Sequence, residues 1–134
     1  MRISSKGDYG LALMVGLAKQ PRLASTSLRQ IAKAEQVPYA YAEQIAARLK
    51  HAKLIVSHRG SQGGYRLERP PSKISVGEII RALDEDKLLP CQKSDHQCPR
   101  QGQCSTHDVW STIQLSLYKT MDKISLHDLL LNKQ

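Results

Sequence analysis

The chain has 134 residues and a formal net charge of +8, with three cysteines and no phenylalanine. This length suits one domain, or one domain with an appendage, and its core must be aliphatic and modest. No apolar run approaches the roughly 18 residues of a membrane-spanning helix, and residues 1–6 lack the apolar segment of a signal peptide. We therefore expect a cytoplasmic protein with reduced thiols and no membrane partner.

The positive charge lies in one half of the chain. Residues 1–70 hold 12 Lys/Arg against 4 Asp/Glu, whereas residues 71–134 hold 8 of each. This partition predicts a nucleic-acid-binding module attached to a neutral sensing or assembly module. A basic surface that serves only to keep the protein soluble is the weaker alternative.

The first elements in chain order are three predicted helices. The first begins near Ser5, with Asp8 three residues on, and ends before Pro21. Ser27 opens a second, short helix with a capping-box pattern over residues 27–30. A third helix is predicted to end near residue 50, with Pro38 in its first turn. Two short helices joined by a tight turn, the second rich in polar side chains, indicate a helix-turn-helix.

A β-hairpin is predicted directly after the third helix. Residues 54–58 and 65–67 have strand patterns, and residues 59–64 form a glycine-rich turn. A basic hairpin that follows a helix-turn-helix is typical of a wing. We therefore expect a winged helix-turn-helix domain over residues 1–71, in a fold that is mainly α with a small β-hairpin.

The second half predicts a helix from the capping box at residues 75–78 to Leu83, a long helix capped by Ser105 and Asp108, and a short helical turn at residues 125–130. The apolar stripe of the long helix is Val109, Ile113, Leu117, Met121 and Ile124, with Trp110 alongside. We expect this stripe to pack against the same helix of a second subunit, because a small chain has little core to offer. Ordinary packing within one chain is the alternative. Residues 72–134 would then combine a sensor segment with a dimerisation helix.

The sensor segment spans residues 91–107. Cys91, Cys98 and Cys104 are separated by six and then five residues, and His107 follows three positions later. The residues between them are polar or turn-forming, which predicts a loop. Cysteines at this wide spacing favour an iron–sulfur cluster, with His96 as a weaker ligand candidate. Structural zinc, a disulfide or three unrelated surface thiols remain alternatives.

These patterns together resemble the IscR/NsrR-type (Rrf-two) family of bacterial winged-helix regulators. The resemblance covers nearly the whole chain and rests on residues 1–10, 41–44, 59–67, 74–80, 91–107 and 125–130. It implies a homodimeric transcriptional regulator that binds a double-stranded DNA operator, with a 2Fe–2S or 4Fe–4S cluster in each subunit. A cluster-free repressor that senses thiol oxidation is the alternative, and an enzyme that uses Cys and His covalently is a remoter one.

The resemblance leaves two candidates for the fourth cluster ligand. His107 matches a position where related proteins supply a histidine to a 2Fe–2S centre. Asp8 matches a position where others supply a carboxylate across the dimer to a 4Fe–4S centre. We favour His107 and 2Fe–2S, because His107 belongs to the cysteine segment itself. The first cysteine interval is one residue longer than is common in the family. The cluster would fix the start of the long helix and so bias how the two winged domains are placed.

The resemblance also assigns DNA contacts. Glu43 and Gln44 would read bases in the major groove, and Ala40 stands where related proteins carry a polar reader. Arg59 in the wing suits a narrow minor groove. The other expected contacts are Tyr41 and Arg48 on the same helix, and Lys6, Arg29, Lys50 and Lys53 on phosphates.

Overall fold

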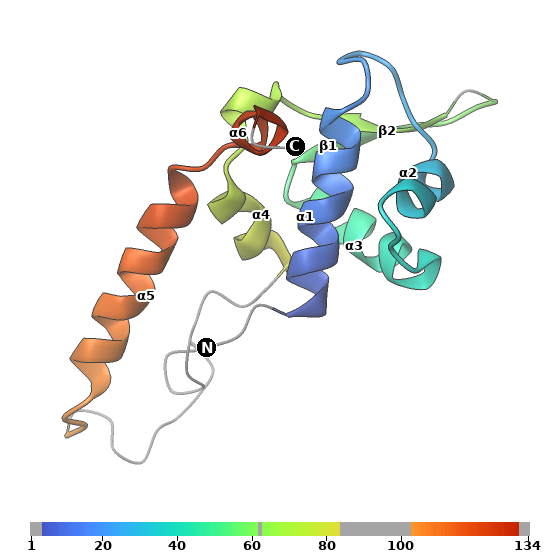
Figure 1. Ribbon diagram of the computed structural model, residues 1–134. Helices are drawn as coiled ribbons and strands as arrows, with labels where there is room; N and C mark the ends of the chain where they lie inside the picture. Colours follow the sequence, from blue (N-terminus) through green and yellow to red (C-terminus); the bar gives the residue numbers. More distant parts are fainter. Residues whose placement is uncertain (1–3, 62, 84–102, 132–134) are drawn as a thin grey trace.

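The computed structural model describes residues 4–61, 63–83 and 103–131. Figure 1 shows a body of short helices that carries a two-stranded hairpin, with one long helix extending away from it. The elements are α1 (Ser5–Ala18), α2 (Leu28–Ala34), α3 (Tyr39–His51), β1 (Ile55–His58), β2 (Gly64–Leu67), the short 3-10 helix η1 (Pro71–Lys73), α4 (Val76–Leu83), α5 (His107–Asp122) and α6 (Leu126–Leu131). The predicted fold class, mainly α with a small β-hairpin, is confirmed.

Three serines begin helices where the sequence predicts them. The hydroxyl of Ser27 accepts a hydrogen bond from the backbone N–H three residues on, at 3.2 Å. Ser75 and Glu78 form a reciprocal box, with each side chain accepting from the other residue's N–H at 3.1 and 2.9 Å. Ser125 and Asp128 repeat this arrangement at the start of α6. These bonds satisfy N–H groups that a helix start leaves without an internal partner.

Two predicted helix caps are wrong. The cap of α1 is Ser4, whose hydroxyl accepts from the N–H three residues on at 3.1 Å, so Ser5 and Asp8 do not form the cap. The residue before α5 is Thr106 rather than Ser105, and it makes no side-chain cap hydrogen bond. Thr106 has φ −107° and ψ −4°, whereas a capping hydroxyl reaches the first turn from extended backbone.

One hydrophobic core joins the two halves of the chain. Its centre is α1, on which α3, α4 and α6 pack. Residues from both sides of position 71 contribute fully buried side chains. The largest of these are Leu13, Met14, Ile45, Leu49, Ile74, Ile79 and Leu126. The winged domain therefore includes α4 and α6 in its packing, and these two helices flank the cysteine segment and α5 in sequence.

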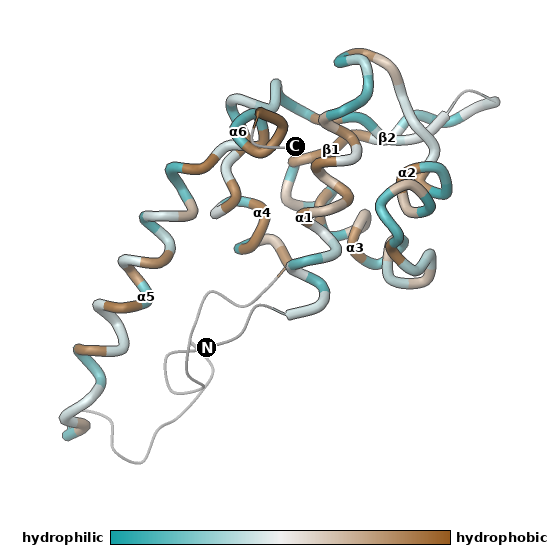
Figure 2. The backbone as a smooth tube through the Cα atoms, viewed as in Figure 1, coloured by the Kyte–Doolittle hydropathy of each residue, from teal (hydrophilic) through white to brown (hydrophobic). Residues whose placement is uncertain are grey.

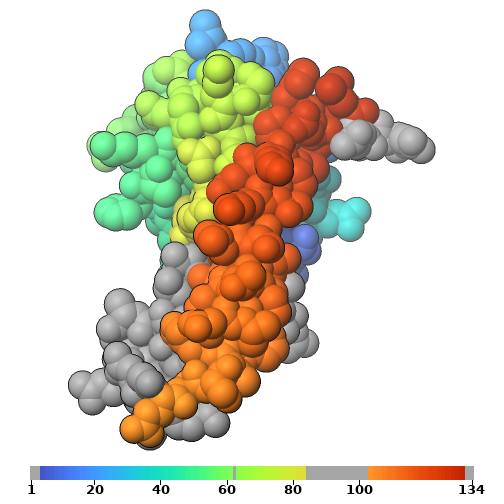
Figure 3. Space-filling model, turned by 90° about the vertical axis from the view of Figure 1, so that its left-hand side faces the viewer, coloured from blue at the N-terminus to red at the C-terminus, as the bar shows by residue number. Residues whose placement is uncertain are grey.

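The long helix α5 is attached to the body through its last turns. Figure 3 looks onto α5 where it lies across α4 and continues past it. Arg81 of α4 pairs with Asp122 at 2.6 Å and lies 4.5 Å over the ring of Tyr118. The hydrogen-bonded Arg81 guanidinium lowers the pKa of Asp122. Gly77 faces the same carboxylate so closely that a Cβ there would overlap it, so glycine allows α4 and α5 to approach.

The first half of the apolar stripe of α5 is exposed, whereas Leu117, Met121 and Ile124 are half-buried. No described residue of this helix is fully buried, and Val109 and Ile113 are 51% and 39% exposed. Figure 2 shows hydrophobic positions recurring along the part of α5 that extends beyond the body. Within the described ranges, no helix has the length and apolar character needed to cross a membrane.

Candidate nucleic-acid interface and cysteine segment

The turn between α2 and α3 has a fixed conformation. Val37 is buried, and its N–H donates to the carbonyl of Ala32 at 2.8 Å. Gln36 before it has φ 58°, a left-handed conformation that persists in a non-glycine residue where the surroundings hold it. The turn therefore sets the angle at which α3 leaves α2.

The outward face of α3 carries the two predicted base readers. Its buried face consists of Ala42, Ile45, Ala46 and Leu49. At 3.6 residues per turn, Glu43 and Gln44 fall on the opposite side, and both are exposed. Ala40 and Ala47 share that side, so the two polar side chains project past small neighbours. A helix with such a face can enter a major groove.

Two of the predicted contact residues are also held by aromatic neighbours. The guanidinium carbon of Arg29 lies 4.0 Å from the centre of the Tyr39 ring. The ring of Tyr41 lies 5.7 Å from that of Tyr9, and Tyr41 remains 47% exposed. These contacts restrict where each polar group can point, which lowers the entropy that DNA binding would cost.

Arg48 connects α3 to the end of α4. Its Nη1 donates to the carbonyl oxygen of Leu83 at 2.9 Å. Leu83 is buried, and its side chain lies so close to Gly10 that a Cβ there would overlap it. Leu83 directly precedes residues 84–102, which contain Cys91 and Cys98. Sequence reasoning placed Arg48 on DNA and missed this contact, because nothing local relates residues 35 positions apart.

The remaining predicted phosphate contacts lie at the ends of elements. Lys50 and Lys53 are exposed around the C-terminus of α3, and Lys53 has φ 61° in the turn to β1. Arg59 is exposed directly after β1, and Lys6 is half-buried in the first turn of α1. The lysines are therefore distributed over more than one edge of the winged domain.

The wing is joined to the helix-turn-helix by backbone hydrogen bonds. Thr26, just before the cap of α2, exchanges N–H···O bonds with Tyr65 of β2 at 2.9 and 2.8 Å. Gly64 has φ 155°, and a Cβ there would meet the carbonyl of Thr26. Only glycine fits at this point. The bridge fixes the hairpin relative to α2, and the sequence analysis did not foresee it.

Part of the cysteine segment lies outside the described residues. This applies to Cys91, Cys98 and His96. Cys104 is half-buried, with its sulfur 3.3 Å from the hydroxyl oxygen of Thr106. His107 is exposed and is the first residue of α5. Among the described residues alone, no group of three or more His, Cys, Asp or Glu is arranged to hold a metal ion.

Asp8 and Cys104 belong to the starts of two different helices, α1 and α5. It is exposed in the first turn of α1, where it lines a hollow of about 470 Å³ together with Val76 and Ile80 of α4. Figure 1 shows the start of α1 at the body and the start of α5 at the distant end of the long helix. A cluster ligated by Cys104 and Asp8 would therefore need Asp8 from a second subunit, whereas His107 is available in the same chain.

Comparison with known proteins decides the family. Residues 3–132 match the family model of Rrf2, described as an iron-dependent transcriptional regulator. The chain belongs to the Rrf2 family. One Rrf2 relative, the regulator CymR of Bacillus subtilis, is 36% identical over 129 residues, which cover 96% of this chain and 89% of that protein. The regulator IscR of Aliivibrio salmonicida is 31% identical over 134 residues, which cover 100% of this chain and 80% of that protein.

Solved Rrf2 structures share the fold. CymR of Bacillus subtilis, titled a global cysteine regulator, has a TM-score of 0.77 at 34% identity and covers 100% of this chain and 99% of its own. IscR of T. potens has a TM-score of 0.77 at 35% identity, with coverage of 100% and 89%. The oxidised form of Staphylococcus aureus CymR has a TM-score of 0.75 at 34% identity, covering 100% and 99%.

These relatives are named transcriptional regulators. This Rrf2 chain is accordingly a DNA-binding transcriptional regulator, and the expectation that it is not an enzyme is confirmed.

Proposed function

We propose that this regulator is a homodimer whose operator binding is controlled by an iron–sulfur cluster on the segment from residue 91 to 107. The observation that carries the proposal is where that segment is attached. Residues 84–90 join it to Leu83, whose carbonyl Arg48 of the proposed recognition helix α3 contacts at 2.9 Å, and it leads through Cys104 into α5. Both ends of the segment thus reach elements whose placement matters for DNA binding.

The chemistry of the donors suits a cluster. Iron–sulfur clusters are held by cysteine thiolates, with occasional histidine replacement. Cys91, Cys98, Cys104 and His107 would hold a 2Fe–2S cluster within one subunit. With Asp8 of the partner as fourth ligand, a 4Fe–4S cluster is the alternative. When bound, the cluster supplies a centre that oxidation or iron loss can alter, while the chain supplies its attachment to α4 and α5.

The exposed first half of the α5 stripe supports the dimer. Val109, Trp110 and Ile113 are 51, 38 and 39% exposed on a helix with no fully buried described residue. A contiguous apolar surface of this kind is typical of a protein interface. A second α5, packed across the first, would cover it and hold two winged domains at a set spacing for two half-sites.

The proposal predicts two kinds of DNA contact. Glu43 and Gln44 on the outward face of α3 read bases, and Arg59 in the wing enters the minor groove. Lys6, Arg29, Lys50 and Lys53 contact phosphates, which position the protein without specifying sequence. Arg48 is engaged with Leu83, so we assign it to coupling in addition to any phosphate contact.

Anaerobic purification tests the cluster. Iron and acid-labile sulfide are counted per chain, and the visible and Mössbauer spectra are recorded. We expect about two of each per chain for 2Fe–2S. Cys104→Ser should lose the cluster, whereas Ser105→Ala, at an exposed neighbouring position, should keep it. Colourless wild-type protein without iron after anaerobic preparation would refute the cluster.

A second candidate is a cluster-free repressor that senses thiol oxidation. The CymR relatives favour it, since one solved neighbour is an oxidised form. Cys104 is half-exposed, as a reacting thiol must be. Iron-free wild-type protein whose DNA affinity changes on peroxide treatment, and is restored by a dithiol, would support this candidate over the first.

A further inference from the structure

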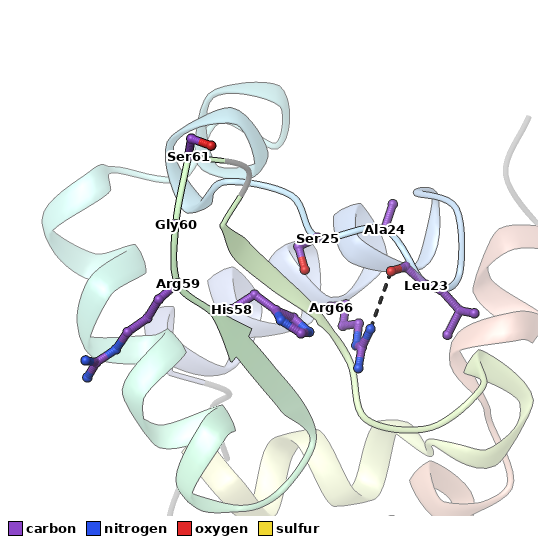
Figure 4. A pocket seen from close by; sticks show the side chains of 8 residues that line it. All are labelled: Leu23, Ala24, Ser25, His58, Arg59, Gly60, Ser61 and Arg66. Carbon is purple, nitrogen blue, oxygen red and sulfur yellow. Dashed lines mark hydrogen bonds between the residues drawn. The ribbon is translucent and has the colours of Figure 1, made fainter.

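The wing has an outer face that the proposed contacts do not use. In β1 and β2, Ile55 pairs with Leu67, and both are buried against the core. Because successive strand residues point to opposite faces, His58 and Arg66 lie on the other face. Figure 4 shows these two side chains pointing to the same side of the hairpin, whereas Arg59 points the opposite way.

The chain between α1 and α2 forms a wall beside this face. Arg22 donates to the carbonyls of Leu67 and Glu68 at 3.1 and 3.3 Å, and Arg66 donates to that of Leu23 at 3.4 Å. With the Thr26–Tyr65 bridge described above, these bonds hold the loop against β2. The space between loop and hairpin is a hollow of about 610 Å³.

The lining of the hollow has one sign of charge. It is formed by Leu23, Ala24, Ser25, His58, Arg59, Gly60, Ser61 and Arg66. None of these described lining residues is acidic. Arg66 uses Nη1 on the Leu23 carbonyl, and a guanidinium has five N–H donors in a fork that matches phosphate. Two serine hydroxyls and a histidine add further donors, so the chemistry suits a phosphate group.

The position of the hollow indicates which DNA phosphate would bind in it. A minor groove is bounded by two sugar–phosphate strands, so a wing that enters it has one strand on each flank. Figure 1 shows α2 and α3 on one side of the hairpin and the loop after α1 on the other. The hollow faces the flank away from the recognition helix. Leu23, which is 75% exposed, adds an apolar surface suited to a deoxyribose.

We infer that this hollow binds a backbone phosphate of the DNA strand on the far side of the minor groove, through Arg66 and His58 with Ser25 and Ser61. The inference rests on the proposed placement of the wing in that groove. The DNA that each subunit contacts would then extend beyond the minor groove that the wing enters. The loop at residues 22–25 would take part in DNA binding.

The test uses the full-length protein and a duplex selected from random sequence by the wild type. His58→Gln/Arg66→Gln removes the guanidinium charge and the imidazole from the hollow, and Lys73→Gln, an exposed lysine on η1, removes one charge elsewhere. If each subunit loses one phosphate contact, the slope of log affinity against log salt should fall by about 1.8 per dimer, since each phosphate contributes about 0.9. Thermal melts check that each variant is folded, and Arg66→Lys, which keeps a charge, should recover part of the slope.

Ethylation interference locates the contact. For the wild type, ethylation of one phosphate per half-site, outside the wing's minor groove, should block binding. The double variant should become indifferent to that ethylation, while interference at phosphates around α3 persists. A folded double variant with the wild-type slope and interference pattern would overturn the inference. If ethylation on neither side of a minor groove interfered with binding of the wild type, the proposed placement of the wing in that groove would itself be contradicted.

Discussion

At the residue scale, Glu43 is the most specific prediction for sequence reading. It is exposed opposite the buried face of α3, and a carboxylate can accept a hydrogen bond from cytosine N4. Glu43→Ala should change which bases are tolerated at one position of each half-site by about 1–3 kcal/mol. Affinities for a panel of single-base operator variants measure this.

Lys53→Ala is the matched control, because a phosphate contact carries no sequence information. It should weaken binding to every duplex of the panel alike. A uniform loss for Glu43→Ala as well would show that Glu43 is not a reader.

The fourth cluster ligand is also a residue-scale question. If His107 ligates, His107→Ala should lose or bleach the cluster while Asp8→Ala keeps its visible spectrum. Absorption spectra of both variants supply the measurement.

The opposite pattern would identify Asp8 as the ligand. Because the starts of α1 and α5 lie apart in one chain (Figure 1), an Asp8→Ala subunit in a mixed dimer should then cost its partner subunit the cluster. Retention of a normal spectrum by both variants would contradict both assignments.

At the element scale, local patterns were predictable and long-range contacts were not. Ser27, Ser75 and Ser125 cap helices as expected, because a capping box depends on residues three positions apart. The pairing of Thr26 with Tyr65 joins segments almost 40 positions apart and has no local signature. The same applies to Arg48 and Leu83, where the sequence indicated an exposed basic residue but not its partner.

The link between α3 and α4 gives an element-scale prediction. Arg48→Gln removes the donor to the Leu83 carbonyl, so the end of α4 would no longer be tied to the recognition helix. In the wild type, the affinities of cluster-loaded and cluster-free protein for one duplex should differ by about 5–150-fold, as is typical of allosteric coupling. In the variant, these two affinities should converge. Titrations of both forms, with Lys50→Gln as control, measure the ratio.

A merely phosphate-binding Arg48 would behave differently. The affinity ratio would stay at its wild-type value, and the slope of log affinity against log salt would fall by about 0.9 for each lost contact. That result would contradict the coupling role.

At the scale of the whole molecule, the division of charge correctly indicated a nucleic-acid-binding protein. The packing between the halves was not predictable from it, because α4 and α6 contribute Ile79 and Leu126 to the same core as α1. A boundary near residue 71 therefore does not separate two hydrophobic cores. The ligands Cys91 and Cys98 remain sequence-based assignments, since they lie outside the described residues.

The dimer predicts the effect of a charge in the α5 stripe. Ile113→Asp would bury a carboxylate without a partner in the seam, which is costly. The variant should sediment as a monomer and lose operator binding. Leu115→Asp is the matched control: two residues along the helix is roughly 200° around it, and Leu115 is 58% exposed. If the Ile113→Asp variant stayed dimeric, or the Leu115→Asp variant became monomeric, the dimer interface would lie on another face of α5.

The most direct test is the operator affinity of one protein preparation before and after cluster removal, at a single salt concentration and without oxygen. Coupling between the cysteine segment and the winged domains predicts dissociation constants that differ by about 5–150-fold. Cys104→Ser should bind with the cluster-free affinity whichever way it is prepared. Equal affinities of cluster-loaded and cluster-free wild type would contradict control of DNA binding by the cluster.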